Sequence, residues 1–401
     1  MKVFVKTRRE SDIAAVIALH SRTKPLRSGE DSHVVIADLA QDEIDTLREN
    51  RCFEVFDDIQ FLPAIGPLMD MWWDRQGVNP LPALSPWASK TLKDVMDHNR
   101  ASKVWDRAQG EGVTLAIVDT GIDGAMLEFM RRSPHSYAPS FSTPWDDAVG
   151  HGTMCAAIAC GSVENKGRYN GVAPGATLLS ARSTLKATDL YLIYQHLLRE
   201  HRKGSFGGGL VVSNSYALYS CTAPAFSEGH PYLDLIRLCV RAGMVFVFAA
   251  GNNHDSGLCG FPAEDDRPNT IWAVNSIDEV ITVGTVDWNE SNQTPGREHS
   301  NSSRGPGQWS VRADKPDVVA PTYGEVAWRG GYRSMEWWGT SGACPQVAGL
   351  AALLLSLDSS LTPESLRETI RKTARALSAP ATCVGAGIID CQAAVGSLAR
   401  S

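Results

Sequence analysis

The sequence predicts an α/β protein, in which a doubly wound, mostly parallel sheet carries helices on both faces and follows a small α+β domain. After Gly112, apolar strand segments alternate with helical segments, a pattern typical of a parallel sheet covered on both sides. Residues 1–62 show a separate pattern of short strand-like and helical segments. Residues 63–86 are rich in Pro and Gly and show no hydrophobic periodicity. We therefore expect a small domain at 1–62, a linker at 63–86 and a large domain at 87–401.

The small domain is expected to hold strands and helices in the order β-α-β-α-β. The segments are a strand at 3–5, a helix at 12–20, a strand at 34–37, a helix at 41–48, and strands at 53–56 and 59–62. The second helix carries Ile44 and Leu47 three residues apart, so both lie on one face. This order fits an α+β sandwich of the ferredoxin-like kind.

The large domain is expected to build its sheet from fully buried strands. Continuous apolar segments at 113–118, 210–212, 244–248 and 280–283 have the length and composition of such strands. Helical stretches at 190–201 and 233–242 lie between them. Thr362 followed by Pro363 predicts a late helix, because an N-cap hydroxyl precedes a proline at the first helical position.

The composition argues against nucleic acid, membrane and zinc as partners. The net charge of −7 and the pI near 5.8 give no general attraction to phosphate backbones or anionic lipid. The longest apolar runs, at 244–250 and 350–355, are far shorter than the roughly 20 residues that cross a bilayer. The nine cysteines include no C-x-x-C pair, which indicates reduced thiols. The N-terminal residues show no secretory core, so we expect a cytoplasmic protein unless export is leaderless or uses an accessory route.

An acid and a histidine follow two neighbouring structural segments. Asp119 comes directly after the strand at 113–118, and His151 lies between Gly150 and Gly152 at the start of a small-residue helix. Open parallel sheets assemble their sites at the carboxyl ends of strands, so both side chains are expected at one edge. The two glycines let the backbone approach a neighbouring strand and leave the imidazole unobstructed. Taken alone, Asp119 could equally cap a turn, and a single histidine is more often structural.

Ser341 lies ahead of a long apolar helix, in the segment GTSGACPQVAGLAALLLS. Free amides and the dipole at a helix start favour negative charge, so the Ser341 amide can help to bind an oxyanion. Taken alone, Ser341 could be a plain N-cap residue. A serine hydroxyl becomes nucleophilic when an imidazole accepts its proton and a carboxylate holds that imidazole, so the three residue types together indicate acyl transfer.

The order Asp119, His151, Ser341, in the contexts VTLAIVDTGID, GHGTMCAAIA and GTSGACPQVAG, resembles the subtilisin-like serine proteases. Further segments similar to that family are GVAPGA at 171–176, VFAAGNN at 247–253, GFPA at 260–263, SNSSRGP at 300–306 and KPDVVAP at 315–321. The resemblance spans roughly residues 101–376. It implies a subtilisin-like fold and a serine endopeptidase that works through an acyl-enzyme, with Asn252 as a side-chain donor to the oxyanion.

The resemblance also implies where a peptide or protein substrate lies. The edge that pairs with an extended peptide corresponds to Ser215, Tyr216 and Ala217. The pocket for the residue before the scissile bond, which we expect to be roomy and mainly apolar, corresponds to Ala249, Ala250, Gly251 and Gly260.

This chain departs from the family pattern beside the nucleophile. Gly342 and Gln346 stand where relatives commonly have Met and His. We expect Gly342 to open space beside Ser341 and to remove an oxidisable thioether, and Gln346 to be a packing change. Cys155 lies four residues after His151, which predicts a thiol one helical turn from the imidazole. We expect it to behave as a buried small residue rather than a nucleophile.

The resemblance implies that the first 62 residues are a propeptide, a chaperone and intramolecular inhibitor whose C-terminal tail occupies the cleft. Self-cleavage is then expected somewhere between Pro63 and Lys90. The chemistry requires no cofactor, but relatives often hold structural calcium. Glu128 and Asn165 lie near the corresponding positions and are the candidate ligands.

Two other functions remain as alternatives. An inactive protein that keeps the fold and binds peptides is disfavoured because all four expected site residues are present. A nucleotide-binding α/β enzyme is less favoured still, since no G-x-G-x-x-G or G-x-x-x-x-G-K-[ST] motif follows a strand.

Overall fold

The computed structural model describes residues 1–9, 12–19, 26–27, 33–64, 89–220, 224, 226–254, 269–289, 294–312 and 314–398. Most of the expected linker at 63–86 and the pocket residue Gly260 therefore lie outside the described residues.

The N-terminal domain is a four-stranded antiparallel sheet with two helices. Its elements are β1 (Lys2–Thr7), α1 (Ile13–Leu19), β2 (Leu26–Arg27), β3 (Val34–Asp38), α2 (Gln41–Glu49) and β4 (Phe53–Asp57). The strand order is β2-β3-β1-β4, which adds the short β2 to the strands that the sequence pattern predicts. Because side chains alternate along a strand, Val3 and Val5 of β1 pack with the helices, whereas Phe4 points to the opposite face.

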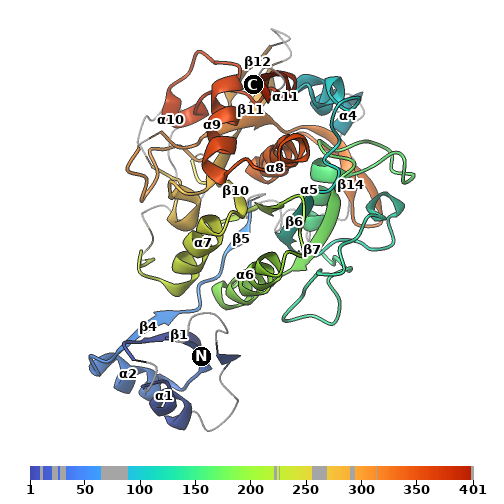
Figure 1. The fold of residues 1–401 in the computed structure, drawn as a ribbon. Helices are drawn as coiled ribbons and strands as arrows, with labels where there is room; N and C mark the ends of the chain where they lie inside the picture. The colour runs from blue at the N-terminus through green and yellow to red at the C-terminus, as the bar shows by residue number, and fades with distance from the viewer. Residues whose placement is uncertain are drawn as a thin grey trace, which may run out of the picture.

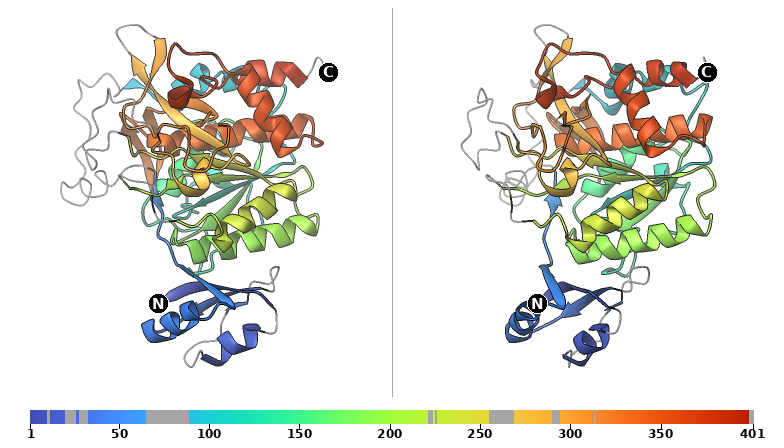
Figure 2. Two further views of the ribbon diagram at one scale, coloured as in Figure 1. Left: turned by 90° about the vertical axis from the view of Figure 1, so that its left-hand side faces the viewer. Right: turned by 60° about the vertical axis from the view of Figure 1, so that its left-hand side comes forward.

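The opposite face of this small sheet packs on the large domain. Phe4 and Ile36 belong to one apolar cluster with α6 (Ala187–Arg202) and α7 (Pro231–Arg241). An ion pair of 2.9 Å joins Lys6 to Asp234 of α7. Figure 2 shows the N-terminal domain below the large domain, joined to it by the chain that leaves β4.

The large domain is built on one central sheet with the order β12-β11-β10-β8-β6-β7, and β13 pairs with β11. The strands are β6 (Thr114–Asp119), β7 (Thr177–Arg182), β8 (Leu210–Asn214), β10 (Val245–Ala249), β11 (Ile281–Asn289), β12 (Thr294–Glu298) and β13 (Val318–Pro321). Every pairing is parallel except that of β11 with β12. All residues of β6, β8 and β10 are buried, as expected for strands covered on both faces.

Helices cover both faces of this sheet (Figure 1). Leu115 and Ile117 of β6 pack in a cluster with α5 (His151–Cys160) and α8 (Gly339–Leu357), whereas Ala116 and Val118 pack in the cluster of α6 and α7. By length and composition α8 could cross a membrane, but 89% of its apolar window is buried within the protein. It is therefore the core helix of the large domain.

The remaining elements surround this core. They are α4 (Leu92–His98), β9 (Tyr216–Ala217), the hairpin of β14 (Gly324–Trp328) and β15 (Gly331–Met335), α9 (Pro363–Thr373), α10 (Ala381–Val384) and α11 (Cys391–Leu398). The expected cap of α9 is present, because the Thr362 hydroxyl accepts a hydrogen bond of 3.1 Å from the Ser365 amide. The sequence pattern missed β7, whose segment TLLSAR mixes apolar and polar residues, and the polar hairpin strand β15.

Candidate active site

Three segments far apart in the chain bring the expected catalytic residues to the carboxyl edge of the sheet. Asp119 is the last residue of β6, His151 is the first residue of α5, and Ser341 lies in the first turn of α8. Asn252 follows β10 by three residues at the same edge. This is where a parallel sheet leaves room for a site.

The acid and the imidazole are in direct contact. Nδ1 of His151 lies 2.7 Å from Oδ1 of Asp119, and both side chains are only 1% exposed. The same carboxylate oxygen accepts a 2.7 Å hydrogen bond from the Thr120 amide. A carboxylate at Nδ1 holds the proton on that nitrogen, so Nε2 is the basic atom that can accept a proton from a nucleophile.

The glycines beside His151 permit this close approach. A Cβ at Gly152 would overlap the carbonyl oxygen of Gly121 in the turn after β6. A Cβ at Gly150, which has a φ of +97°, would overlap the indole of Trp328. Larger residues at either position would push α5 away from β6 and separate the imidazole from Asp119.

The hydrogen-bond partner of the Ser341 hydroxyl differs from the one that the sequence predicts, which is the imidazole of His151. It donates a hydrogen bond of 3.1 Å to the carbonyl of Ser215. The thiol of Cys155 lies 4.0 Å from His151 Nδ1 and 3.7 Å from the Ser341 carbonyl, so the imidazole and the serine adjoin the same thiol. Catalytic contacts commonly tighten only in the reacting complex, so this hydrogen bond to Ser215 is compatible with later proton transfer to His151.

The cleft beside Ser341 holds a segment of the chain itself. The strand β5 (Leu62–Pro63) pairs antiparallel with β9, with Leu62 opposite Ala217 and Pro63 opposite Tyr216. The next amide, that of Ala64, donates a hydrogen bond of 2.9 Å to the Ser215 carbonyl. The expected substrate edge thus carries an added strand, as it would with an extended peptide substrate.

The carbonyl of Ala64 lies against the two expected oxyanion donors. Its oxygen accepts a short hydrogen bond from Nδ2 of Asn252 and a 3.4 Å hydrogen bond from the Ser341 amide. A Cβ at Gly339 would overlap this oxygen, so the residue at that position must be glycine for the carbonyl to enter. The arrangement presents the Ala64 carbonyl to Ser341 as a substrate carbonyl would be presented.

Thr340 orients the asparagine, a role that sequence reasoning missed. Oδ1 of Asn252 accepts hydrogen bonds from the Thr340 amide at 3.1 Å and the Thr340 hydroxyl at 2.9 Å. Both acceptor positions of the side-chain oxygen are filled, so Nδ2 must point to the cleft. The signal available in the sequence was the threonine directly before Ser341.

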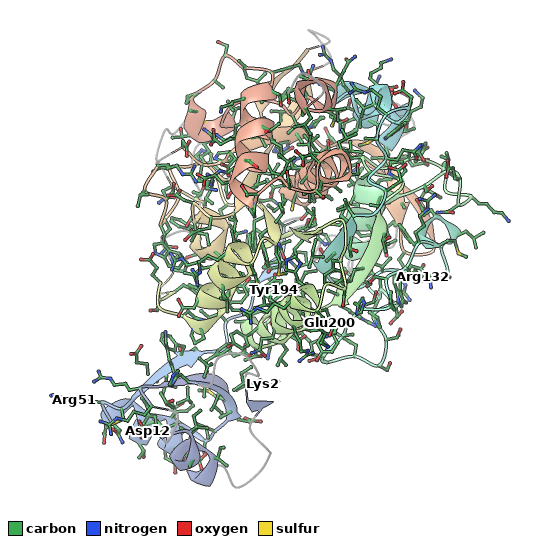
Figure 3. The ribbon with its side chains drawn as sticks, viewed as in Figure 1. Lys2, Asp12, Arg51, Arg132, Tyr194 and Glu200 are labelled. Atoms are coloured by element: carbon green, nitrogen blue, oxygen red, sulfur yellow. The ribbon has the colours of Figure 1, made fainter. Side chains whose placement is uncertain are left out.

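Phe61 anchors the same segment in an aromatic pocket. Its side chain is fully buried, with ring centroids 5.4 Å from Tyr216, 5.5 Å from Tyr232 and 6.3 Å from Phe226. Beneath Tyr216 lies Tyr194 of α6, labelled in Figure 3, whose hydroxyl donates a 2.6 Å hydrogen bond to Asn214. Sequence reasoning placed a strand here but not its anchor, although the run IQFL directly before the linker was the visible signal.

The other expected pocket residues are only partly placed. Ala249 and Ala250 are buried at the end of β10, and Gly251 lies against Ala217, whose Cβ would be 3.2 Å from a Cβ at this glycine. Gly260 lies outside the described residues. Their role in the pocket before the scissile bond stays a prediction.

The expected space beside the nucleophile is filled, which corrects the interpretation of Gly342. A Cβ at this position would lie 2.6 Å from the Cβ of Trp338, and the fully buried indole of Trp338 occupies the volume that a larger side chain would need. Gln346 behaves as expected of a packing residue: its amide donates to the carbonyls of Pro321 and Gly342, at 2.6 and 2.9 Å. Its oxygen accepts a 2.9 Å hydrogen bond from Asn99.

The environment of Cys155 disfavours a nucleophilic role. Burial, reinforced by the nearby charge of Asp119, raises the pKa of the Cys155 thiol well above its usual range. A nucleophilic cysteine requires the opposite shift toward thiolate. The residue is a protonated, buried thiol between α5 and α8.

Of the two candidate calcium ligands, Glu128 is buried and has a hydrogen-bond donor at its carboxyl. Glu128 is 3% exposed, its carboxyl accepts a 2.8 Å hydrogen bond from the Tyr332 hydroxyl, and burial raises the pKa of Glu128 to about 7. Asn165 is half-buried. Glu128 belongs to no group of three or more His, Cys, Asp or Glu ligands within the described ranges. Calcium takes 6–8 oxygen ligands, which include backbone and amide carbonyls, and the role of Glu128 and Asn165 as two of them stays a prediction.

Comparison with known proteins supplies the family. A model of the subtilase family matches residues 110–387. The chain is 30% identical to a calcium-dependent protease of Trichormus variabilis over 309 residues, which are 70% of this chain and 44% of that protein. It is 28% identical to subtilisin E of Bacillus subtilis over 288 residues, 71% of this chain and 66% of that protein. The chain thus spans less than half the length of the first of these relatives.

Solved structures support the fold across both domains. Fervidolysin of Fervidobacterium pennivorans, a keratinolytic enzyme related to subtilisin, superposes with a TM-score of 0.69 at 21% identity, over 98% of this chain and 60% of the other. MycP1 of Mycobacterium smegmatis gives a TM-score of 0.59 at 23% identity, over 84% and 89% of the two chains. The expected subtilisin-like α/β fold is confirmed.

Proposed function

This chain belongs to the subtilase family of serine proteases, and we propose that it is a serine endopeptidase that first cuts its own chain between Ala64 and Ile65. The observation that carries this proposal is the position of the Ala64 carbonyl, which accepts hydrogen bonds from Asn252 Nδ2 and the Ser341 amide. These donors act on the oxygen of the carbonyl that is attacked. The bond that follows this carbonyl, to Ile65, is therefore the scissile bond.

The residues of the site perform the reaction in two steps. After rotation of its side chain, the Ser341 hydroxyl gives its proton to Nε2 of His151 and attacks the carbonyl carbon of Ala64. The negative oxygen is held by Asn252 and the Ser341 amide, while Asp119 stabilises the imidazolium. Collapse breaks the bond to Ile65, whose nitrogen takes the proton from His151. Water then releases Ala64 as a carboxylate and restores the serine.

We further propose that residues 1–64 remain bound after cleavage as an inhibitor. Asp58 accepts hydrogen bonds of 2.9 Å from both the amide and the hydroxyl of Thr188, in the first turn of α6. His230 donates a 3.2 Å hydrogen bond to the Asp57 carbonyl. Neither these contacts nor the burial of Phe61 involves the bond that is cut, so cleavage leaves them in place. A solved structure of MycP1, which aligns over 75% of this chain at 25% identity, is described as having its N-terminal propeptide removed, and this supports the proposal of an N-terminal propeptide here.

Peptide or protein substrates would then bind as the self-segment does. An extended chain would pair with β9, place an aromatic side chain among Tyr216, Phe226 and Tyr232, and present its carbonyl to Ser341. A fluorogenic peptide with the sequence Phe-Leu-Pro-Ala before the cleaved bond is the matching probe.

Self-processing and labelling test this function together. We expect purified wild-type chain to shorten and Ser341 to react with a fluorophosphonate, whereas Ser341→Ala stays full length and unlabelled. Equal shortening of both chains would contradict self-cleavage, and a wild-type chain that neither shortens nor labels would support the inactive binding protein instead.

Two relatives are named as calcium-dependent proteases, and Glu128 is a candidate cation ligand in this chain. We propose that the Tyr332 hydroxyl takes the place of a cation at this carboxyl. Arg168 stacks on the Tyr332 ring at 4.2 Å and pairs with Glu325 at 2.7 Å, which ties the loop after α5 to the β14–β15 hairpin without a metal.

A further inference from the structure

A second buried carboxylate lies directly before α5. Asp147 is 2% exposed and sits four residues ahead of His151. Five neutral groups donate to it: Oδ1 accepts from the Thr120 hydroxyl and from the amides of Val149 and Gly150, at 2.9, 3.1 and 2.8 Å. Oδ2 accepts from the amide and the hydroxyl of Thr153, at 2.9 and 2.7 Å. An ordinary helix cap satisfies one or two donors, whereas this side chain gathers five.

These hydrogen bonds join the two segments that carry the triad. Thr120 follows Asp119 directly, and its hydroxyl both donates to Asp147 and accepts a 3.0 Å hydrogen bond from the Gly152 amide. From the other side, the Thr153 hydroxyl donates to Asp147 and accepts a 3.0 Å hydrogen bond from the Asp123 amide. The carboxylate therefore fixes the first turn of α5 against the turn after β6 at two separate points.

The start of α5 places backbone donors and the helix dipole at the Asp147 carboxylate. The amides of Gly150 and Thr153 belong to the start of α5, where the helix dipole stabilises an anion. Asp147 lies four residues before the imidazole that becomes positive during the reaction, and it acts electrostatically on Cys155, whose thiol is 4.0 Å from that imidazole. Other titratable groups recorded at this imidazole are Asp119 and Cys155.

We propose that Asp147 is a positioning residue for His151, which holds α5 so that the imidazole meets Asp119 and whose charge favours the imidazolium formed when Ser341 attacks. This role goes beyond the triad and rests on the proposed endopeptidase activity. Neither part requires contact between Asp147 and the substrate.

The substitution Asp147→Asn tests the proposal against a matched control. Asp146→Asn removes the same charge from the adjacent residue, whose side chain is 59% exposed and pairs with Arg182. For Asp147→Asn we expect self-processing and kcat to fall by about 10-fold to 10²-fold with little change in KM, since misplacement of a catalytic group has effects of that size. The acid limb of the kcat/KM profile should move to lower pH, because loss of a nearby negative charge lowers the pKa of the imidazolium.

A second pair of variants separates position from charge and covers a failure of Asp147→Asn to fold. Thr153→Val removes two of the linking hydrogen bonds but keeps the charge, whereas Thr153→Ser retains the hydroxyl. We expect Thr153→Val to lower kcat with its acid limb unmoved, and Thr153→Ser to restore kcat.

Three results would overturn the proposal. They are an Asp147→Asn enzyme that matches Asp146→Asn within twofold in kcat, a loss confined to KM, and equal kcat values for Thr153→Val and Thr153→Ser. Inactivity of the wild-type chain would instead refute the endopeptidase function itself.

Discussion

Two helices begin at the active-site edge, and their N-termini serve different purposes. At the start of α5 the free amides are occupied by a resident carboxylate, that of Asp147. At the start of α8 the Ser341 amide faces the cleft and receives the carbonyl of Ala64. Both ends attract negative charge for the same electrostatic reason.

The difference is whether the charge is permanent. Because Asp147 is part of the protein, the start of α5 is stabilised before any reaction and can hold His151 in place. The start of α8 receives only a neutral carbonyl in the ground state, so its donors gain strength when the oxygen becomes an anion. The N-terminus of α5 thus positions the histidine, whereas the N-terminus of α8 stabilises the transition state.

The largest effect on kcat should come from removing the side-chain donor at the start of α8. Asn252→Ala removes the side-chain donor to the Ala64 carbonyl and should lower kcat by about 10²–10³. Thr340→Val leaves the donor but removes one of the hydrogen bonds that orient it, and should cost clearly less. The rate of self-processing and kcat on the Phe-Leu-Pro-Ala peptide measure both; equal losses in the two variants would contradict the assigned roles.

A smaller effect is expected where the bound segment is anchored. Phe61→Ala empties the aromatic pocket formed by Tyr216, Phe226 and Tyr232. The cleaved N-terminal domain should dissociate sooner, because burial of a large aromatic side chain contributes a few kcal/mol. We expect peptidase activity to appear with a shorter lag after processing, while Leu62→Ala, at a side chain that is 40% exposed, should leave the lag unchanged.

The C-terminal end of α5 can be compared with its start, because a buried carboxyl group lies at each end. Glu128 packs against Gly161, the C-cap of α5, and its carboxyl has one recorded donor, Tyr332. Burial raises its pKa to about 7, so its contribution to stability is present in acid and is lost as pH rises through that value. Glu128→Gln should therefore raise the melting temperature relative to wild type at pH 8 but not at pH 4.5.

The same variant tests the fit of calcium. We expect Glu128→Gln to melt at a higher temperature than wild type at pH 8 both with and without a chelator. If calcium stabilised the wild-type chain at pH 8 and Glu128→Gln abolished that effect, Glu128 would be a cation ligand and the hydrogen bond from Tyr332 would not be its native partner.

The smallest effect is expected at the thiol between the two helices. Cys155→Ala should keep kcat within about threefold, because a protonated, buried thiol contributes packing rather than chemistry. Loss of activity in Cys155→Ala with labelling of Ser341 retained would instead give Cys155 a catalytic role.

The sequence was sufficient for features that depend on local pattern. Short segments of sequence predict the buried strand before Asp119, the glycines around His151 and the helix that follows Ser341. The structure contains all three features. Fold class and family, which depend on several such segments, were predicted correctly. The N-cap at Thr362 is another local feature of this kind.

Features that depend on distant contacts were not predictable in the same way. Nothing local to Ala64 reveals that it meets Ser215, about 150 residues later, so the sequence left the cleavage bond open. The filling of the space beside Gly342 is a local feature that the interpretation overlooked, because Trp338 lies one helical turn earlier. The direction of the Ser341 hydroxyl is a rotamer, which a sequence does not record.

The central claim is that the carbonyl held at the start of α8 belongs to the bond that is cut. Brief incubation of wild-type chain in H₂¹⁸O, followed by intact-mass analysis, measures it directly. We predict a fragment of residues 1–64 with one ¹⁸O in the Ala64 carboxylate, absent from Ser341→Ala. A first fragment that ends at any other residue would contradict the account.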